Sequence, residues 1–264
     1  MTRRPPSSIR LERRGPVATV TVDRPEVRNA LAPATIRELG EVVARLEEDE
    51  ELVAVIVTGA GDGAFISGGD LRALQKVEGA ESGRRMARLT QRVLARLEAL
   101  EVPVIAAING PAYGGGAEVA CACDIRIAAE SASFAFRQVH MGIMPAWGAT
   151  YRLPRQVGRS RALELLLTGR TIGAREALDI GFVDRVVPTG TALEAALELA
   201  RAIAASPPLS IRMIKQAVLG GRDASAEAGQ VLESGLLGIL WGSEDHGEAV
   251  RAYFAKRPPR WRGR

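Results

Sequence analysis

Strand patterns and helix patterns alternate along the first half of this chain, and the alternation limits its fold more than any other feature. Continuous apolar runs of strand length occupy residues 17–22, 53–57 and 102–108. Between them, residues 33–46 and 86–100 place apolar side chains at the spacing of one helix face. Strands that alternate with helices are typical of α/β proteins, so the chain is predicted to build an α/β core.

The last third of the chain is different, because helix patterns follow one another there without strands between them. Gly and Pro separate these patterns, which lie at residues 162–167, 174–178, 193–204, 209–219 and 224–241. We see no obvious linker, so one continuous domain is expected. Within it we predict a disordered start at residues 1–7, a core at residues 8–200, and a helical region at residues 201–264 that makes oligomer contacts.

Composition bounds the class of protein. The 264 residues are 47% hydrophobic and 25% charged, which is enough apolar material for a sizeable core. The apolar stretches are shorter than the roughly 20 residues that cross a bilayer. Residues 1–8 carry charge with no apolar stretch behind them, unlike a secretory signal. We therefore expect a cytoplasmic protein that does not associate with a membrane.

Charge and cysteine content restrict the partners further. The formal net charge of +4 permits an anionic partner without requiring one. Cys121 and Cys123 stand two residues apart in an apolar stretch, a spacing that suits neither a local disulfide nor a zinc site. Both are expected to be small buried side chains. The sequence predicts no metal site.

Glycines cluster at two places, each just before a helix pattern: Gly68 with Gly69, and Gly114 with Gly115 and Gly116. A residue without a Cβ lets a ligand approach the backbone, and N–H groups at a helix N-terminus point outward with the positive end of the helix dipole behind them. Both turns are therefore candidate oxyanion sites. Neither spells GxxxxGK[ST] or GxGxxG, the patterns of nucleotide phosphate loops.

Two segments carry most of the information about function: residues 64–71 (AFISGGDL) and residues 105–124 (IAAINGPAYGGGAEVACACD). Together they resemble the crotonase superfamily, the enoyl-CoA hydratase/isomerase family. The resemblance covers about residues 8–260 and includes residues 23–31, 141–145, 167–172 and 177–183. These motifs in this order are specific for the superfamily, but they do not distinguish the reactions within it.

The resemblance implies a crotonase-like spiral of ββα units with a C-terminal helical trimerisation region, in a homotrimer or homohexamer. It implies an acyl-CoA thioester as substrate, with coenzyme A as part of that substrate and no separate cofactor. It also implies that the N–H groups of Gly69 and Gly115 form an oxyanion hole, which holds the thioester oxygen as the substrate becomes an enolate.

Glu118 matches one of the two catalytic glutamates of the hydratases. A carboxylate among apolar neighbours has its pKa raised by desolvation, which suits a general acid or base. The alternative is a favourable charge in the first turn of a helix. The second catalytic glutamate of the family falls on Gln138, which can hydrogen-bond a water or a substrate group but cannot accept a proton.

The resemblance also implies where the adenine and pantetheine of coenzyme A lie: along the loop after the first strand, near residues 28–31, and along residues 66–71. The full set of predicted substrate contacts is Arg28, Ala30, Ile66, Gly68, Gly69, Asp70, Leu71, Gly114, Gly115 and Trp147. Arg28 is a candidate contact for a phosphate of coenzyme A or a solvated arginine in a turn. Trp147 is a candidate wall of the acyl pocket or a core residue.

The predicted function is that of an acyl-CoA lyase or isomerase, which hydrates a 2-enoyl-CoA or moves its double bond. Decarboxylation or hydrolysis of an acyl-CoA is an alternative, favoured if Arg137 faces the acyl pocket and pairs there with a second carboxylate. His140 is a candidate replacement for the missing base, with a structural role as the alternative. A non-catalytic relative that binds acyl-CoA or RNA is a third possibility; Glu118 argues against it, and we expect no nucleic acid partner.

Overall fold

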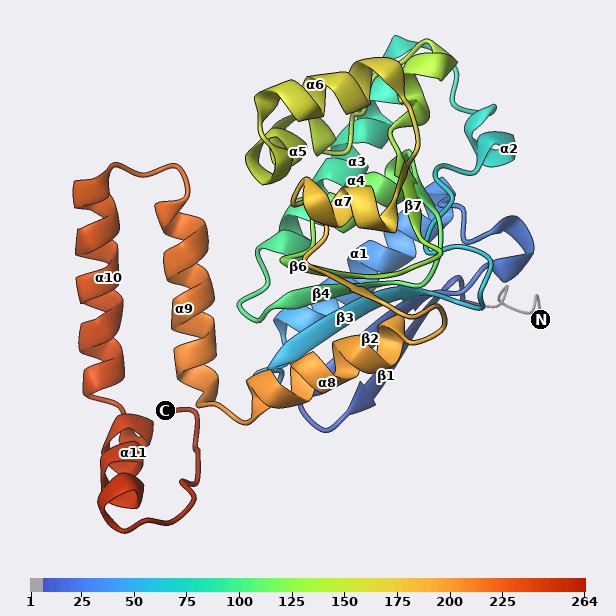
Figure 1. Ribbon diagram of the computed structural model, residues 1–264. Helices are drawn as coiled ribbons and strands as arrows, with labels where there is room; N and C mark the ends of the chain where they lie inside the picture. Colours follow the sequence, from blue (N-terminus) through green and yellow to red (C-terminus); the bar gives the residue numbers. More distant parts are fainter. Residues whose placement is uncertain (1–6) are drawn as a thin grey trace.

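The computed structural model describes residues 7–264, with a six-stranded sheet at the centre of the core (Figure 1). The strand order is β1-β2-β3-β4-β6-β9, and the pairs are parallel except for β1 with β2. The strands are β1 (Ile9–Arg14), β2 (Val17–Val22), β3 (Ala54–Gly59), β4 (Val104–Ile108), β6 (Ile125–Ala129) and β9 (Arg185–Val187). Of the start predicted to be disordered, residues 1–7, the described part contains Ser7 alone.

Helices cover both faces of this sheet, which explains why the inner strands β2, β3 and β4 are buried along their whole length. On one face, Val55 of β3 packs in a cluster with α1 (Pro33–Glu47) and α3 (Ala80–Glu98). On the other face, the next residue, Ile56, packs with α8 (Ala192–Ala204). Successive side chains of a strand point to opposite faces, so β3 contributes to two separate apolar clusters.

A second sheet of three short strands lies beside the glycine turns. Its strand β5 (Ala112–Tyr113) follows β4 closely and leads directly into α4 (Gly115–Cys121), which gives one ββα unit. Strand β5 pairs in parallel with β7 (Ser133–Ala135), and β7 pairs antiparallel with β8 (Ile172–Gly173). The helix α4 begins at Gly115, two residues earlier than the sequence pattern predicts, because its first two residues are glycines.

Short helices complete the core. They are η1 (Pro25–Val27), α2 (Leu71–Leu74), η2 (Arg137–Met141), α5 (Ala149–Val157), α6 (Arg159–Thr168) and α7 (Ala174–Asp179). In Figure 1 the last three lie together above the sheet. Helix α5 packs on α4 and on α6, so it holds the chain that follows η2 against the second glycine turn.

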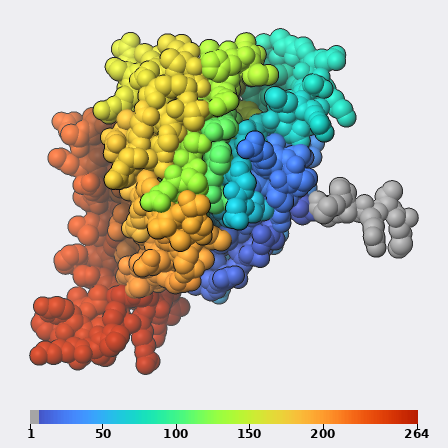
Figure 2. Space-filling model, turned by 45° about the vertical axis from the view of Figure 1, so that its right-hand side comes forward, coloured from blue at the N-terminus to red at the C-terminus, as the bar shows by residue number. Residues whose placement is uncertain are grey.

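The last three helices, α9 (Pro208–Gly221), α10 (Ala226–Trp241) and α11 (Glu244–Phe254), form what we call the C-terminal arm. The arm stands away from the sheet and projects beyond the rest of the surface (Figures 1 and 2). Helices α9 and α10 pack side by side, yet α10 contains no buried residue. Large apolar side chains are more than half exposed at Ile214, Val218, Val231, Leu237, Ile239, Trp241, Tyr253 and Phe254.

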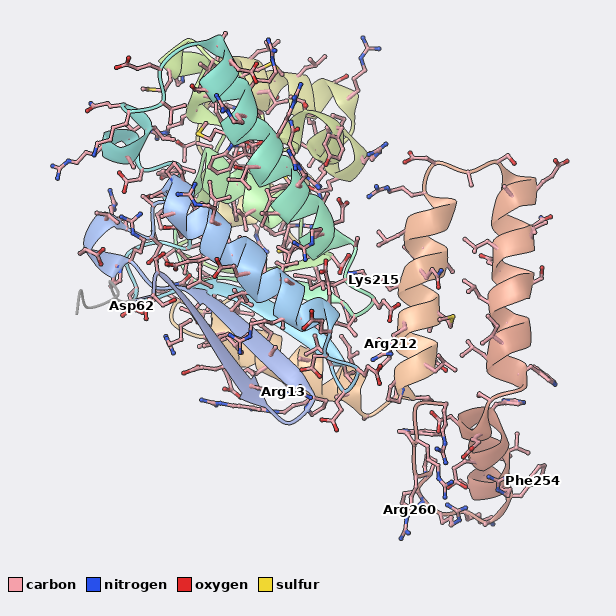
Figure 3. The ribbon with its side chains drawn as sticks, turned by 180° about the vertical axis from the view of Figure 1, so that it is seen from behind. Arg13, Asp62, Arg212, Lys215, Phe254 and Arg260 are labelled. Atoms are coloured by element: carbon pink, nitrogen blue, oxygen red, sulfur yellow. The ribbon has the colours of Figure 1, made fainter. Side chains whose placement is uncertain are left out.

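The arm begins after α8, which packs on the sheet, so the boundary predicted at residue 201 falls inside that helix. Two cations of α9, Arg212 and Lys215, extend toward the sheet (Figure 3). Across residues 7–264, no helix combines the length and the apolar character needed to cross a membrane.

Candidate active site

The two glycine turns lie against each other. A Cβ built on Gly68, whose φ is +120°, would stand 3.1 Å from the carbonyl oxygen of Tyr113 and 3.9 Å from the nitrogen of Gly115. A Cβ on Gly116 would overlap the backbone of Ile66. The backbones are therefore too close for side chains at these positions, which is the physical reason for the glycines.

The N–H groups of Gly69 and Gly115 have no acceptor within residues 7–264. The neighbours of Gly69 are fixed, because the N–H of Leu31 donates to the Gly68 carbonyl (2.8 Å) and the N–H of Asp70 donates to the Leu31 carbonyl (2.9 Å). Gly115 is the first residue of α4 and is buried, so its N–H is one of the unsatisfied donors at a helix N-terminus. Two fixed donors without acceptors suit a ligand oxygen.

Glu118 lies in α4, one turn beyond Gly115, and is only 2% exposed. Its Oε2 accepts from the N–H groups of Trp147 (2.8 Å) and Ala149 (3.1 Å), and its Oε1 accepts from Nε2 of Gln138 (2.8 Å). Burial raises the pKa of the Glu118 carboxyl, although these donors offset part of the rise. A carboxyl with a raised pKa and a fixed orientation is suited to move a proton near neutral pH.

Gln138, on η2, is the second polar side chain beside Glu118. Its Nε2 is occupied by Glu118, while its Oε1 is buried and has no donor among the described residues. Its amide faces Gly114, since a Cβ added to that glycine would make an ordinary van der Waals contact with it at 3.9 Å. Buried acceptors are rarely left unpaired, so Oε1 marks a place where a water or a substrate hydroxyl can donate.

Trp147 joins the site through its backbone and its ring. Its N–H donates to Glu118, and its ring lies so close to Gly115 that a Cβ there would overlap the indole. The ring is 6% exposed. Trp147 therefore both orients the carboxylate and forms a wall next to the N-terminus of α4.

The predicted contacts of coenzyme A lie on two adjacent segments. Ala30 and Ile66 are buried, Arg28 is exposed, and Leu71 is 57% exposed at the outer edge. Asp70 has a structural partner that the sequence pattern missed: Nη2 of Arg24 donates to its Oδ2 (2.9 Å), while Nη1 of Arg24 donates to the Ala30 carbonyl.

Arg24 thus ties the loop after β2 to residues 66–71. The hydrogen bond from Arg24 lowers the pKa of the Asp70 carboxyl, against the opposing effect of burial. The side chain of Asp70 also caps α2 by accepting from the N–H of Ala73 (3.2 Å). In the sequence Arg24 differs from Arg28 in standing immediately before Pro25. This position does not reveal that Arg24 pairs with Asp70.

Arg137 and His140 do not join these residues. The guanidinium of Arg137 lies 4.7 Å from the ring centre of Tyr113, and its Nη2 donates to Oγ1 of Thr171 (3.0 Å). The exposed His140 packs its ring against Gly169. Within the described residues neither side chain hydrogen-bonds Glu118 or Gln138.

Both cysteines are buried and free. Burial raises the pKa of the Cys123 thiol to about 12 and raises that of Cys121 as well, so both are neutral side chains of the core. Between residues 7 and 264, no three His, Cys, Asp or Glu side chains come together in a way that could hold a metal ion.

Similarity to known proteins covers nearly the whole chain. A family model described as enoyl-CoA hydratase/isomerase matches residues 12–264. A short-chain-enoyl-CoA hydratase of Clostridium acetobutylicum is 40% identical over 251 residues, which are 95% of this chain and 96% of that protein. A carnitinyl-CoA dehydratase of Proteus mirabilis is 39% identical, over 97% of this chain and 99% of its own.

Solved structures extend the similarity to the fold. An enoyl-CoA hydratase from Bacillus anthracis superposes with a TM-score of 0.94 at 36% identity, covering 97% of this chain and all (100%) of that one. A putative enoyl-CoA hydratase from Streptomyces coelicolor superposes with a TM-score of 0.93 at 34% identity, over 100% of this chain and 98% of its own. The predicted crotonase-like α/β fold is thereby confirmed.

Proposed function

The chain belongs to the enoyl-CoA hydratase/isomerase family and is an enzyme, and from this premise we propose that it adds water across the 2,3 double bond of a short-chain 2-enoyl-CoA. One observation carries the proposal: a single buried carboxylate, Glu118, is held by three donors one helix turn from a free N–H. Hydration needs an oxyanion hole for the thioester and a group that moves the proton of water. The site offers both.

The thioester oxygen lies between the N–H groups of Gly69 and Gly115. As water adds to C3, negative charge develops on this oxygen, and both donors are already oriented toward it. Loss of one donor from a comparable oxyanion hole costs about 3–4 kcal/mol of transition-state stabilisation. The glycines are thus essential through their backbone, and no side chain is needed at either position.

Glu118 serves both proton-transfer steps. Its carboxylate takes a proton from water as the water oxygen bonds to C3, which leaves an enolate; the same proton then passes to C2, so that H and OH have been added and the carboxylate is restored. Oε1 of Gln138 accepts a hydrogen bond from the other O–H of the water, which stays intact. Glutamine orients the nucleophile here without competing for the proton.

The rest of the substrate lies along the two segments around Arg28 and residues 66–71. Arg28 is exposed there and contacts a phosphate of coenzyme A, while Trp147 bounds the acyl group. Addition of water changes no net oxidation state, so the reaction uses no redox cofactor. The thioester oxygen is stabilised by N–H groups, and we expect activity to withstand removal of divalent metals by a chelator.

The test is the reaction with crotonyl-CoA in D₂O, followed by mass spectrometry and NMR. The natural protein is expected to give the 3-hydroxy product with deuterium at C2, and Glu118→Gln to lower kcat by about 10²–10⁴-fold. A matched control is Glu81→Gln, an exposed glutamate in the first turn of α3. If Glu118 were only a favourable charge in a first helix turn, both variants would behave alike.

Two further results separate hydration from isomerisation. In Gln138→Glu, a second carboxylate beside the water is expected to raise the hydration rate. If the natural protein exchanges deuterium at C2 or C4 without forming the hydroxy product, the enzyme is instead an isomerase that uses Glu118 alone. If it neither exchanges nor reacts, the proposal fails for this substrate class, and malonyl-type thioesters test the decarboxylase alternative.

The protein assembles as a homotrimer or homohexamer through the C-terminal arm. The support is the row of exposed apolar side chains on α10, an area that a lone subunit would leave in water. Leu237→Glu is expected to lower the mass measured by sedimentation, because it places a charge in the contact. Gln230→Glu, which adds the same charge at an exposed polar position of α10, is the control.

A further inference from the structure

Residues 145–149, the loop before α5 together with the first residue of that helix, supply two of the three donors to Glu118 and contact a buried cation; we call them the loop 145–149. Arg152 of α5 is 2% exposed, and its Nη1 donates to the carbonyl oxygen of Trp147 (3.1 Å). The guanidinium packs against Gly148 so closely that a Cβ there would overlap it. Trp147 thus gives its N–H to Glu118 on one side and its carbonyl to Arg152 on the other.

The charge of Arg152 is balanced by Glu98, at the end of α3. Nε and Nη2 of Arg152 donate to the same oxygen of Glu98, at 2.9 and 2.8 Å. Burial acts to raise the pKa of Glu98, but the hydrogen bonds from Arg152 and Arg222 outweigh it and leave the pKa below its ordinary value. Glu98 is therefore an anion in the fold, and it fixes the guanidinium in one orientation.

We propose that Arg152, held by Glu98, is a positioning residue for the reaction: it fixes the loop 145–149 so that the N–H groups of Trp147 and Ala149 point at the carboxylate of Glu118. The inference rests on the proposed role of Glu118. Neither Arg152 nor Glu98 hydrogen-bonds Glu118 directly in the described residues, so their effect passes through the loop.

Loss of this support has a signature that loss of stability alone does not produce. The N–H donors favour the ionised form of Glu118, so a relaxed loop raises the pKa of this carboxyl further. Its nearest polar neighbours are uncharged: the amide of Gln138, the loop N–H groups, and the thiol of Cys121 on α4. On α5, the other cation, Arg155, is paired with the exposed Asp223.

The experiment compares Arg152→Lys with Arg126→Lys. Arg126 is also buried, bonds the carbonyls of Phe182 and Cys123, and pairs with Asp184, but it does not touch the loop. Lysine keeps the charge and loses the fork of donors in both cases. The readouts are kcat and KM for crotonyl-CoA, the pH profile of kcat/KM, and the melting temperature.

Arg152→Lys is expected to lower kcat at neutral pH by about tenfold to a hundredfold with little change in KM, because the carboxylate is misplaced. The acid limb of kcat/KM is expected to move to higher pH. Arg126→Lys is expected to lower the melting temperature without moving that limb. Glu98→Gln, which removes the anion and keeps the shape, is expected to shift the limb in the same direction and carries the test if Arg152→Lys does not fold.

The inference is overturned if Arg152→Lys, or Glu98→Gln in its place, leaves kcat and the acid limb as they are in the natural protein, or changes them no more than Arg126→Lys does. Failure of the proposed function looks different, because Glu118→Gln would then keep the activity of the natural protein. If Glu118→Gln is inactive but Arg152→Lys leaves the acid limb of kcat/KM where it is in the natural protein, the positioning role of Arg152 is wrong and the proposed function stands.

Discussion

The second glycine turn and the C-terminal arm differ in how far their apolar side chains are buried. Around Gly115 the packing is tight: the ring of Trp147 lies against its Cα, and the backbone of Ile66 lies against Gly116. Along α10 no residue is buried, and large apolar side chains face outward. The glycine turn makes its apolar contacts within this chain, whereas the arm leaves large apolar side chains exposed, which supports the proposed assembly through the arm.

The arm is not exposed throughout, because Lys215 of α9 is buried and reaches into the core. Its Nζ donates to Oδ2 of Asp124 (2.6 Å) and to the carbonyl of Val102 (2.9 Å). Burial raises the pKa of Asp124, and Lys215 opposes that rise. Lys215→Met would leave the partly buried Asp124 carboxyl with the N–H of Val104 but without its cation, so we expect the free energy of unfolding to fall by about 3 kcal/mol.

Urea unfolding at a fixed protein concentration measures this loss, since an oligomer's stability depends on concentration. Lys76→Met, an exposed lysine that follows α2, is the control. A loss as small as that of the control would mean that α9 is held by its apolar contacts rather than by the ion pair.

Gly115→Ala tests the close packing of the second glycine turn. The new methyl group would overlap the indole of Trp147, so the ring or α4 must move, and an oxyanion donor moves with it. We expect kcat to fall by about 10²–10³-fold and stability by about 1–3 kcal/mol. Gly83→Ala, in α3, is the matched control because nothing lies within 4 Å of its added Cβ. Equal activity of the two variants would contradict the predicted displacement of this donor.

The pair of Arg24 and Asp70 tests whether the first turn is as self-contained as the second. The folded pKa of Asp70 lies below its unfolded value, near 3.9, so folding favours the ionised form. The stabilisation is full above the unfolded pKa and is lost as the pH falls through the folded pKa. Arg24→Met is therefore expected to cost about 1 kcal/mol at pH 7 and progressively less below pH 4.

Urea unfolding across this pH range checks the sign, and KM for crotonyl-CoA shows whether the loop after β2 has moved. Arg28→Met is the informative partner, because Arg28 is exposed and is proposed to bind a phosphate. It is expected to raise KM with no loss of stability. If the difference in free energy of unfolding between Arg24→Met and the natural protein is the same at every pH, the pairing with Arg24 does not lower the pKa of Asp70.

Sequence and structure agree best where the signal is local. The strands β2, β3 and β4, the helices α1, α8, α9 and α10 and the two glycine turns were predicted, because the period of apolar residues and the positions of glycines are visible in neighbouring residues. That Gln138 stands at a glutamate position came from the resemblance to the family. Arg152 and Glu98 were missed, because they are 54 positions apart and no neighbour of either marks the pairing. The same holds for Arg24 and Asp70, which are 46 apart.

Two candidates do not contact Glu118, for a geometric reason that a sequence pattern does not contain. Arg137 and His140 flank Gln138 in the sequence, but η2 is a 3-10 helix with three residues per turn, so residues one or two apart point in different directions. Only the amide faces Glu118. The helical pattern of α10 was likewise correct, yet periodicity alone did not reveal that the helix is uncovered in a single subunit.

The smallest expected effect concerns the contact between the C-terminal arm and Glu98, the glutamate that holds Arg152. Arg222, at the end of α9, donates from Nη1 to Oε1 of Glu98 (3.0 Å), while Arg152 occupies the other oxygen. Arg222 is substantially exposed, so Arg222→Gln is expected to change stability by less than about 1 kcal/mol and to leave kcat unchanged. Melting and steady-state kinetics beside Arg152→Lys measure both. A fall in kcat equal to that of Arg152→Lys would mean that the arm sets the orientation of Glu118, and assembly and chemistry would then be coupled through one glutamate.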